Sequence, residues 1–199
     1  MDIDILIFDG VDELDAVAPY EVLRRAERAT ASARVRLVHA NGVTAVVGSC
    51  GLRFEVDTRF EPGEADILIV PGGGWATKSP VGAWAEHERG QLEPLIAQAK
   101  TPTSTMAGVC TGTMLLAYAG IASGRRANTH HSAAGELASL GVDVVSDRVV
   151  DDGDLVTCGG VTSGIDLALW LVEREIDPTL ADRIAVGMEY RRERPSLVR

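Results

Sequence analysis

Short apolar segments rich in β-branched residues alternate along the chain with longer segments whose apolar residues recur every three or four positions. The first pair is a strand predicted at residues 3–8 and a helix predicted at residues 14–29. Further strands are predicted at residues 35–39, 45–47, 52–56, 67–70, 102–109, 127–129, 142–145, 149–150 and 155–157. Further helices are predicted at residues 84–99, 111–119, 132–140, 163–175 and 178–190.

This alternation of strands and helices predicts the fold class. Parallel strands need crossover connections, and helices of about ten to fifteen residues supply them. We therefore expect an α/β fold, an open and mostly parallel sheet with helices on both faces. A single domain is expected over residues 1–190, followed by a frayed C-terminal tail at residues 191–199.

Composition and charge narrow the class of protein. The chain has 199 residues, 46% hydrophobic, which is enough to bury a full core, and a formal net charge of −10 without any run of like charges. Binding to nucleic acid or to an anionic membrane is therefore disfavoured. The N-terminus lacks the basic region of a signal peptide, and no apolar run approaches the ~20 residues that span a bilayer.

Three cysteines without C-x-x-C spacing indicate neither a disulfide framework nor a zinc site, so we expect a soluble cytoplasmic protein without a metal. Cys110 has the most informative surroundings, since Gly108-Val109-Cys110-Thr111-Gly112 joins a predicted strand directly to a predicted helix. This is the spacing of a nucleophile elbow with sulfur in place of hydroxyl, and a helix N-terminus lowers the pKa of a cysteine. The alternative is a buried structural cysteine, which packs as a small apolar residue.

Two other segments also follow predicted strands, where doubly wound sheets bind ligands. In Pro71-Gly72-Gly73-Gly74, the Gly73 N–H could join the Thr111 N–H as an oxyanion hole, although a plain flexible connector is the alternative. In Glu13-Leu14-Asp15, either carboxylate could cap the following helix. The sharper hypothesis is that Asp15 lies beside Cys110, is kept protonated by burial and transfers protons.

Two adjacent histidines follow another predicted strand, and only one of them can face the same site. Either His130 or His131 could act as a base or an orienting group for Cys110. A loop histidine that is merely hydrogen-bonded is the alternative, and the pair lacks the further ligands of a metal site.

Five of these segments also carry a resemblance to a known family. They are Glu13-Leu14-Asp15-Ala16-Val17-Ala18-Pro19, Pro71-Gly72-Gly73, Gly108-Val109-Cys110-Thr111-Gly112, Thr129-His130 and Gly159-Gly160-Val161-Thr162-Ser163-Gly164-Ile165-Asp166. With these motifs the chain resembles the ThiJ/PfpI superfamily, of the class I glutamine amidotransferase-like fold, nearly end to end. The C-T-G elbow, the early L-D and the G-G-x-T-x-G-I-D segment are most similar to the isocyanide (isonitrile) hydratase branch.

The resemblance implies a flavodoxin-like fold, a homodimer and an active site near the dimer interface. It implies Cys110 as the nucleophile and Asp15 as its acidic partner, where many relatives carry glutamate. Gly73 and Thr111 would be the backbone donors, and His130 matches a histidine that many relatives place near the cysteine. Thr111 departs from the protease-like branch, which has histidine after the nucleophile, and His131 replaces the bulky aromatic residue of the hydratase branch.

The activity expected from both lines of reasoning is hydration of an isocyanide through a Cys110 thioimidate to an N-substituted formamide, with no cofactor. The alternatives are a glyoxalase or deglycase activity on 2-oxoaldehydes, and a non-catalytic redox sensor that oxidises Cys110. A hydratase needs a dry, apolar pocket for its small electrophilic substrate, whereas a glyoxalase prefers a small polar one.

Overall fold

An eight-stranded sheet runs through the middle of the molecule, with strand order β12-β10-β11-β7-β6-β1-β2-β5. The computed structural model describes residues 1–42 and 44–197. All neighbouring strands of this sheet are parallel except β10 and β11, which pair antiparallel. The strands are β1 (Asp2–Leu6), β2 (Arg34–His39), β5 (Thr58–Arg59), β6 (Ile67–Val70), β7 (Thr105–Val109), β10 (Val149–Asp151), β11 (Leu155–Cys158) and β12 (Ser196–Leu197).

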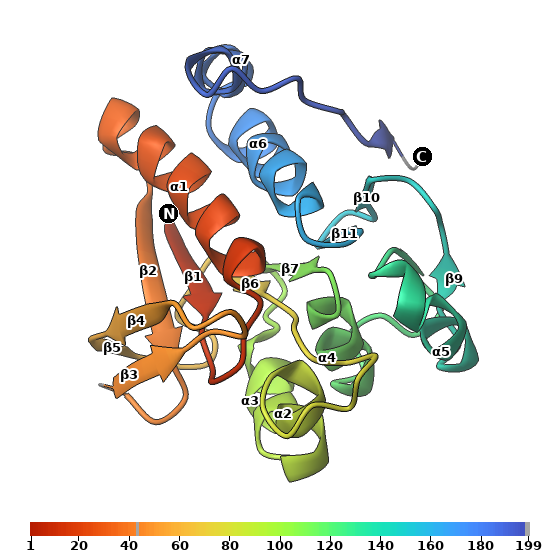
Figure 1. The fold of residues 1–199 in the computed structure, drawn as a ribbon. Coiled ribbons are helices and arrows are strands. Elements are labelled where there is room, and N and C mark those ends of the chain that lie inside the picture. Colours follow the sequence, from red (N-terminus) through yellow and green to blue (C-terminus); the bar gives the residue numbers. More distant parts are fainter. Residues whose placement is uncertain (43, 198–199) are drawn as a thin grey trace.

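Helices cover both faces of the sheet, as the alternation of elements predicts (Figure 1). One face carries α1 (Glu13–Thr30), α6 (Ser163–Glu175) and α7 (Pro178–Gly187). The other carries α2 (Ala83–Arg89), α3 (Leu92–Ala99) and α4 (Gly112–Tyr118). The central strands β6 and β7 are buried along their whole length, which explains their continuous apolar sequences.

Smaller elements project from the ends of the strands. A hairpin of β3 (Thr44–Val47) and β4 (Arg53–Val56) follows β2. A second small sheet pairs β8 (Arg126–Ala127) with β9 (Asp143–Val144), with the 3-10 turn η1 (His131–Ala133) and α5 (Ala134–Ser139) between them. Among the described residues, none of the helices combines the length and the apolar character needed to cross a bilayer.

Most predicted elements are present, but several bounds differ. The strand predicted at residues 102–109 begins at Thr105, the helix predicted at residues 178–190 ends at Gly187, and β5 was not predicted. The helix predicted at residues 84–99 is two helices, because Gly90 adopts a left-handed conformation (φ 64°) and ends α2. The expectation of a frayed tail at residues 191–199 is wrong for Ser196–Leu197, which pair with β10 as an edge strand. Pairing of this kind depends on a distant strand and leaves no periodic signal in so short a segment.

Candidate active site

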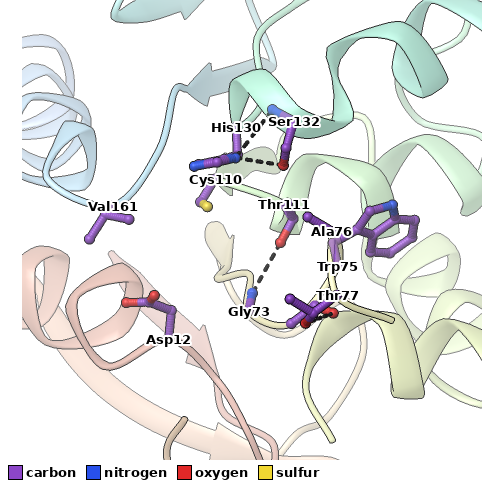
Figure 2. A pocket seen from close by; sticks show the side chains of 11 residues that line it. Asp12, Gly73, Trp75, Ala76, Thr77, Cys110, Thr111, His130, Ser132 and Val161 are labelled. Carbon is purple, nitrogen blue, oxygen red and sulfur yellow. Dashed lines mark hydrogen bonds between the residues drawn. The ribbon is translucent and has the colours of Figure 1, made fainter. Parts of the chain in front are cut away.

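The carboxyl ends of β1, β6, β7 and β11 converge on a cavity of about 150 Å³. Open α/β sheets bind ligands at this edge, where the loops after the strands come together. The cavity contains Cys110, Thr111 and Gly73 together with His130, as Figure 2 shows. Its other lining residues are Asp12, Gly74, Trp75, Ala76, Thr77, Ser132 and Val161.

Cys110 occupies a sharp turn between β7 and α4. Its backbone is left-handed (φ 55°), a strained conformation for a residue with a side chain. The flanking glycines are sterically required: a Cβ on Gly112 would lie 1.9 Å from the Val70 carbonyl oxygen, and one on Gly108 would lie 2.5 Å from Thr113 Oγ1. The close packing of β6, β7 and α4 therefore presents the cysteine side chain at the cavity, which is the geometry of a nucleophile elbow.

Asp15 lies behind Cys110, fully buried in the first turn of α1. One carboxyl oxygen accepts a hydrogen bond from the Gly72 N–H (3.1 Å), and the other has no hydrogen-bond partner of ordinary geometry among the described residues. Burial, reinforced by the nearby Asp12 carboxylate, raises the pKa of Asp15 well above its ordinary value. This shift favours the protonated form of Asp15, next to the thiol.

Two opposing influences set the charge of the Cys110 sulfur. Burial and the Asp15 carboxylate raise the pKa of the thiol to about 12, whereas hydrogen bonds from the Val161 and Thr111 N–H groups lower it. A protonated Asp15 has no negative charge and no longer raises the pKa of the thiol through its charge. The two N–H donors still lower the pKa of the thiol. Asp15 and Cys110 are therefore expected to hold one proton between them, because two adjacent negative charges would repel each other.

The Gly73 N–H, which the sequence predicts as an oxyanion-hole donor together with the Thr111 N–H, already has a hydrogen-bond partner in the structure. The Gly73 N–H donates to Thr111 Oγ1 (3.0 Å), so it is engaged in holding the loop after β6 against the elbow. The Thr111 N–H and the Val161 N–H, from the loop after β11, both interact with the cysteine sulfur. Val161 also has a left-handed backbone (φ 46°), a strained conformation for a β-branched residue.

The structure separates the two histidines. His130 lines the cavity beside Cys110, whereas His131 lines a different depression that also contains Asn128 and Arg148. His130 Nδ1 accepts from the Ser132 N–H (3.3 Å), which places the proton of the neutral ring on Nε2. Burial lowers the pKa of His130, so the neutral ring is the favoured form.

Asp12, Glu13 and Asp15, at the start of α1, each have different hydrogen-bond partners. Asp12, which the sequence reasoning did not single out, is the N-cap, accepting from the Leu14 N–H (3.2 Å), and it lines the cavity. Glu13 accepts hydrogen bonds from the Cys50 N–H (2.6 Å) and from Ser49 Oγ (3.0 Å), which attach the β3–β4 hairpin to α1. Only Asp15 reaches Cys110 from behind.

Val161 and Trp75 are further cavity residues that sequence reasoning missed. Val161 follows the Gly159-Gly160 pair after a strand, a signal that a search of strand ends could have used. Trp75 follows the glycines after β6 and carries no comparable pattern, because a single tryptophan after a turn is more often a core residue.

Residues 1–174 match the DJ-1/PfpI family. The chain belongs to this family. It is 37% identical to the isonitrile hydratase of Pseudomonas putida over 193 residues, which cover 96% of this chain and 78% of the relative. It is 27% identical to a deglycase of Pyrococcus abyssi, over 77% of this chain and 86% of the relative.

The structural likeness extends over nearly the whole chain. A ThiJ/PfpI family protein from Pseudomonas syringae, solved as a crystal structure, superposes with a TM-score of 0.83 and 26% identity. That alignment covers 98% of this chain and 76% of the crystallised chain. The flavodoxin-like fold expected from the resemblance is therefore confirmed, whereas the different names within the family leave the reaction to be argued from the site.

Proposed function

We propose that this protein is a cysteine-dependent hydratase that adds water to an isocyanide and releases an N-substituted formamide. The observation that carries the proposal is the pairing of Cys110, on its strained elbow, with the fully buried Asp15 behind it, whose pKa is raised by burial. Such a pair supplies a nucleophile and a proton to the same carbon. The 37% identity to an isonitrile hydratase supports this choice of electrophile.

The shape of the cavity agrees with this substrate class. Trp75, Ala76 and Val161 supply apolar surface, and the volume of about 150 Å³ matches a cavity that holds a benzene-sized ring. An alkyl or aryl isocyanide with a six-membered ring is therefore a suitable test substrate. A larger substituent would have to extend through the mouth of the cavity.

The reaction begins with attack of the Cys110 thiolate on the terminal carbon of R–N≡C. The C–S bond forms while Asp15 gives its proton to that carbon, which yields the thioimidate R–N=CH–S–Cys110. The oxygen of a water molecule then adds to the carbon, and one of the water protons reaches the nitrogen. The C–S bond breaks as the remaining hydroxyl proton passes to the Asp15 carboxylate, which releases R–NH–CHO and restores the thiolate and the acid.

Three groups assist the sulfur and the substrate in this scheme. The Val161 and Thr111 N–H groups stabilise the thiolate before attack and after its release. His130 lines the cavity with the proton of its neutral ring on Nε2, so the ring would donate a hydrogen bond to the substrate nitrogen or to the attacking water.

Turnover of cyclohexyl isocyanide, measured as N-cyclohexylformamide by chromatography, tests the proposal. Wild type and Cys50→Ser, which alters a cysteine outside the cavity, should make formamide. Cys110→Ser should make none, and Asp15→Asn should lose at least ~100-fold in kcat, the usual contribution of a positioned acid. Formamide from Cys110→Ser would refute the mechanism.

The same proteins distinguish the alternative functions. Consumption of methylglyoxal that depends on Cys110, without any formamide, would favour the glyoxalase or deglycase activity that the Pyrococcus abyssi relative suggests. Loss of both activities together with stoichiometric oxidation of Cys110 by peroxide would favour a redox sensor.

A further inference from the structure

Asp12 is the one residue lining the described part of the cavity whose side chain is formally charged at neutral pH. The other lining residues include no lysine or arginine, and His130 favours its neutral form. Figure 2 shows the Asp12 carboxyl across the cavity from His130, on the same side as Val161. An electrophile that enters this cavity to reach the Cys110 sulfur therefore comes close to the Asp12 carboxylate.

The Asp12 charge is only partly compensated by its surroundings. Its hydrogen bond comes from a neutral backbone donor, the Leu14 N–H, and no lysine or arginine forms an ion pair with it in the described residues. The positive end of the α1 helix dipole lies next to this carboxylate and offsets part of its charge. The Asp12 charge also acts on two neighbouring groups. It raises the pKa of Asp15, and it raises the pKa of His130 against the larger lowering caused by burial.

The net charge of the whole chain adds to this local effect. A formal charge of −10 repels small anions at long range, and the focusing of field lines in a cavity strengthens the repulsion at the sulfur. Two unit charges about 6 Å apart, at an effective dielectric constant of roughly 40, repel enough to slow a reaction about tenfold.

We propose that Asp12 makes the Cys110 cavity selective for neutral and cationic electrophiles and excludes electrophiles that carry a carboxylate or another anionic group. For the substrate class this inference rests on the proposed function: the isocyanides accepted are uncharged or carry an amine, and isocyanides bearing a carboxylate are rejected. The selectivity itself concerns access to the sulfur and can be tested without any hydratase activity.

Alkylation of Cys110 by iodoacetamide and by iodoacetate measures this selectivity directly. Both reagents form a C–S bond as iodide leaves, and they differ in one negative charge. The rate of each is followed by peptide mass spectrometry on full-length protein in a Cys50→Ser background, since Cys50 is exposed and would react as well. N-acetylcysteine supplies the intrinsic ratio of the two rates.

The decisive variant is Asp12→Asn, because asparagine keeps the helix cap and removes the charge. Asp177→Asn is its matched control. Asp177 caps α7 through the Thr179 and Leu180 N–H groups, lies outside the cavity and changes the net charge by the same amount.

In wild type and Asp177→Asn, the preference for iodoacetamide at Cys110 should exceed that of N-acetylcysteine by about tenfold. Asp12→Asn should reduce this excess at least threefold, mainly through faster reaction with iodoacetate. Equal preferences in Asp12→Asn and wild type would overturn the proposal. So would a failure of iodoacetamide to reach Cys110 in either protein.

A second arm compares methyl isocyanoacetate with the isocyanoacetate anion as substrates. Turnover of the ester but not of the anion in wild type, with a gain on the anion in Asp12→Asn, extends the selectivity to the proposed reaction. If neither compound is turned over while the alkylation preference shifts as expected, the hydratase function fails and the role of Asp12 stands. Equal turnover of the ester and the anion by wild type would contradict the substrate class.

Discussion

At the residue scale, the site depends on backbone conformations that only certain positions tolerate. Cys110 and Val161 both have left-handed backbones, and each such residue costs on the order of 1 kcal/mol or more. The tight contacts around Gly108 and Gly112 hold the elbow in place against this strain. The glycines are therefore part of the machinery that orients the sulfur.

Gly112→Ala tests this requirement. The added Cβ would lie 1.9 Å from the Val70 carbonyl oxygen, a backbone atom that cannot move without disturbing β6, so a loss of at least ~2 kcal/mol in the free energy of unfolding is expected. Gly135→Ala is the matched control, because Gly135 lies in a helix with open space around it and should gain up to ~1 kcal/mol. Urea unfolding measures both, and similar values for the two variants would contradict the steric argument.

At the element scale, a single carboxylate joins the loop after β6 to the segment that carries His130. Glu136 on α5 accepts hydrogen bonds from Trp75 Nε1–H (2.9 Å) and from the Tyr118 hydroxyl (2.9 Å). Burial and the Glu136 carboxylate raise the pKa of Tyr118 to about 12, so its hydroxyl remains a donor. Trp75, Tyr118 and His87 also pack ring against ring, with the His87 and Tyr118 centroids 4.0 Å apart. Glu136 thus joins two walls of the cavity, the loop that carries Trp75 and the segment that follows His130.

Glu136→Ala should loosen these walls. The loss of both hydrogen bonds leaves the buried Trp75 Nε1–H without its acceptor, for an expected cost of about 1–2 kcal/mol. Tryptophan emission should shift to longer wavelength as Trp75 becomes hydrated, and kcat/KM for an isocyanide should fall. Glu88→Ala, on the exposed side of α2, serves as the control. An unchanged emission spectrum in Glu136→Ala would show that the ring packing alone holds the loop.

At the scale of the whole molecule, the buried acid couples the active site to folding. Asp15 ionises near its ordinary pKa of 3.8 in the unfolded chain and well above that value in the folded chain. Between these two pKa values the folded chain keeps a proton that the unfolded chain has lost, so the free energy of unfolding decreases as the pH rises. The protein thereby loses part of its stability by keeping on Asp15 the proton that the proposed reaction would use.

Asp15→Asn should remove this pH dependence. Asparagine stays neutral and can still accept from the Gly72 N–H, so the variant should gain stability over wild type progressively from pH 4 to pH 7.5. Asp177→Asn should show almost no trend over this range, because hydrogen bonds with Thr179 and Leu180 lower the pKa of Asp177 from its ordinary value of 3.8 and its effect on stability changes only below that pH. Parallel urea-unfolding curves across this pH range for wild type and Asp15→Asn would show that Asp15 is ionised in the folded protein.

The homodimer implied by the family resemblance is also a prediction at this scale. Leu14 is 47% exposed and Leu52 is 50% exposed, and the bonds of Glu13 to the hairpin hold them on the same end of the molecule. The double variant Leu14→Lys/Leu52→Lys should sediment as a monomer where wild type sediments as a dimer. Val186→Lys, at a residue 77% exposed on α7, should leave the dimer intact. A wild-type monomer would refute the prediction.

The sequence by itself indicated the order of most elements and the position of the proposed nucleophile. Strand and helix periods depend on neighbouring residues, so β6 and α6 agree with their predicted bounds. The elbow was equally readable, because Gly108 and Gly112 lie two residues either side of Cys110 where a predicted strand runs directly into a predicted helix. Asp15 could be proposed as an acid from its apolar neighbours and the family resemblance.

Only the tertiary structure decided which groups meet at the sulfur. The Val161 N–H comes from a loop some fifty residues away in sequence, and its arrival depends on the pairing of β11 with β7. The same packing engages the Gly73 N–H with Thr111, directs His130 rather than His131 into the cavity, and leaves Asp12 at its edge. A local pattern specifies the conformation of a segment, whereas the distance between segments depends on strand register and helix crossing, which no single segment encodes.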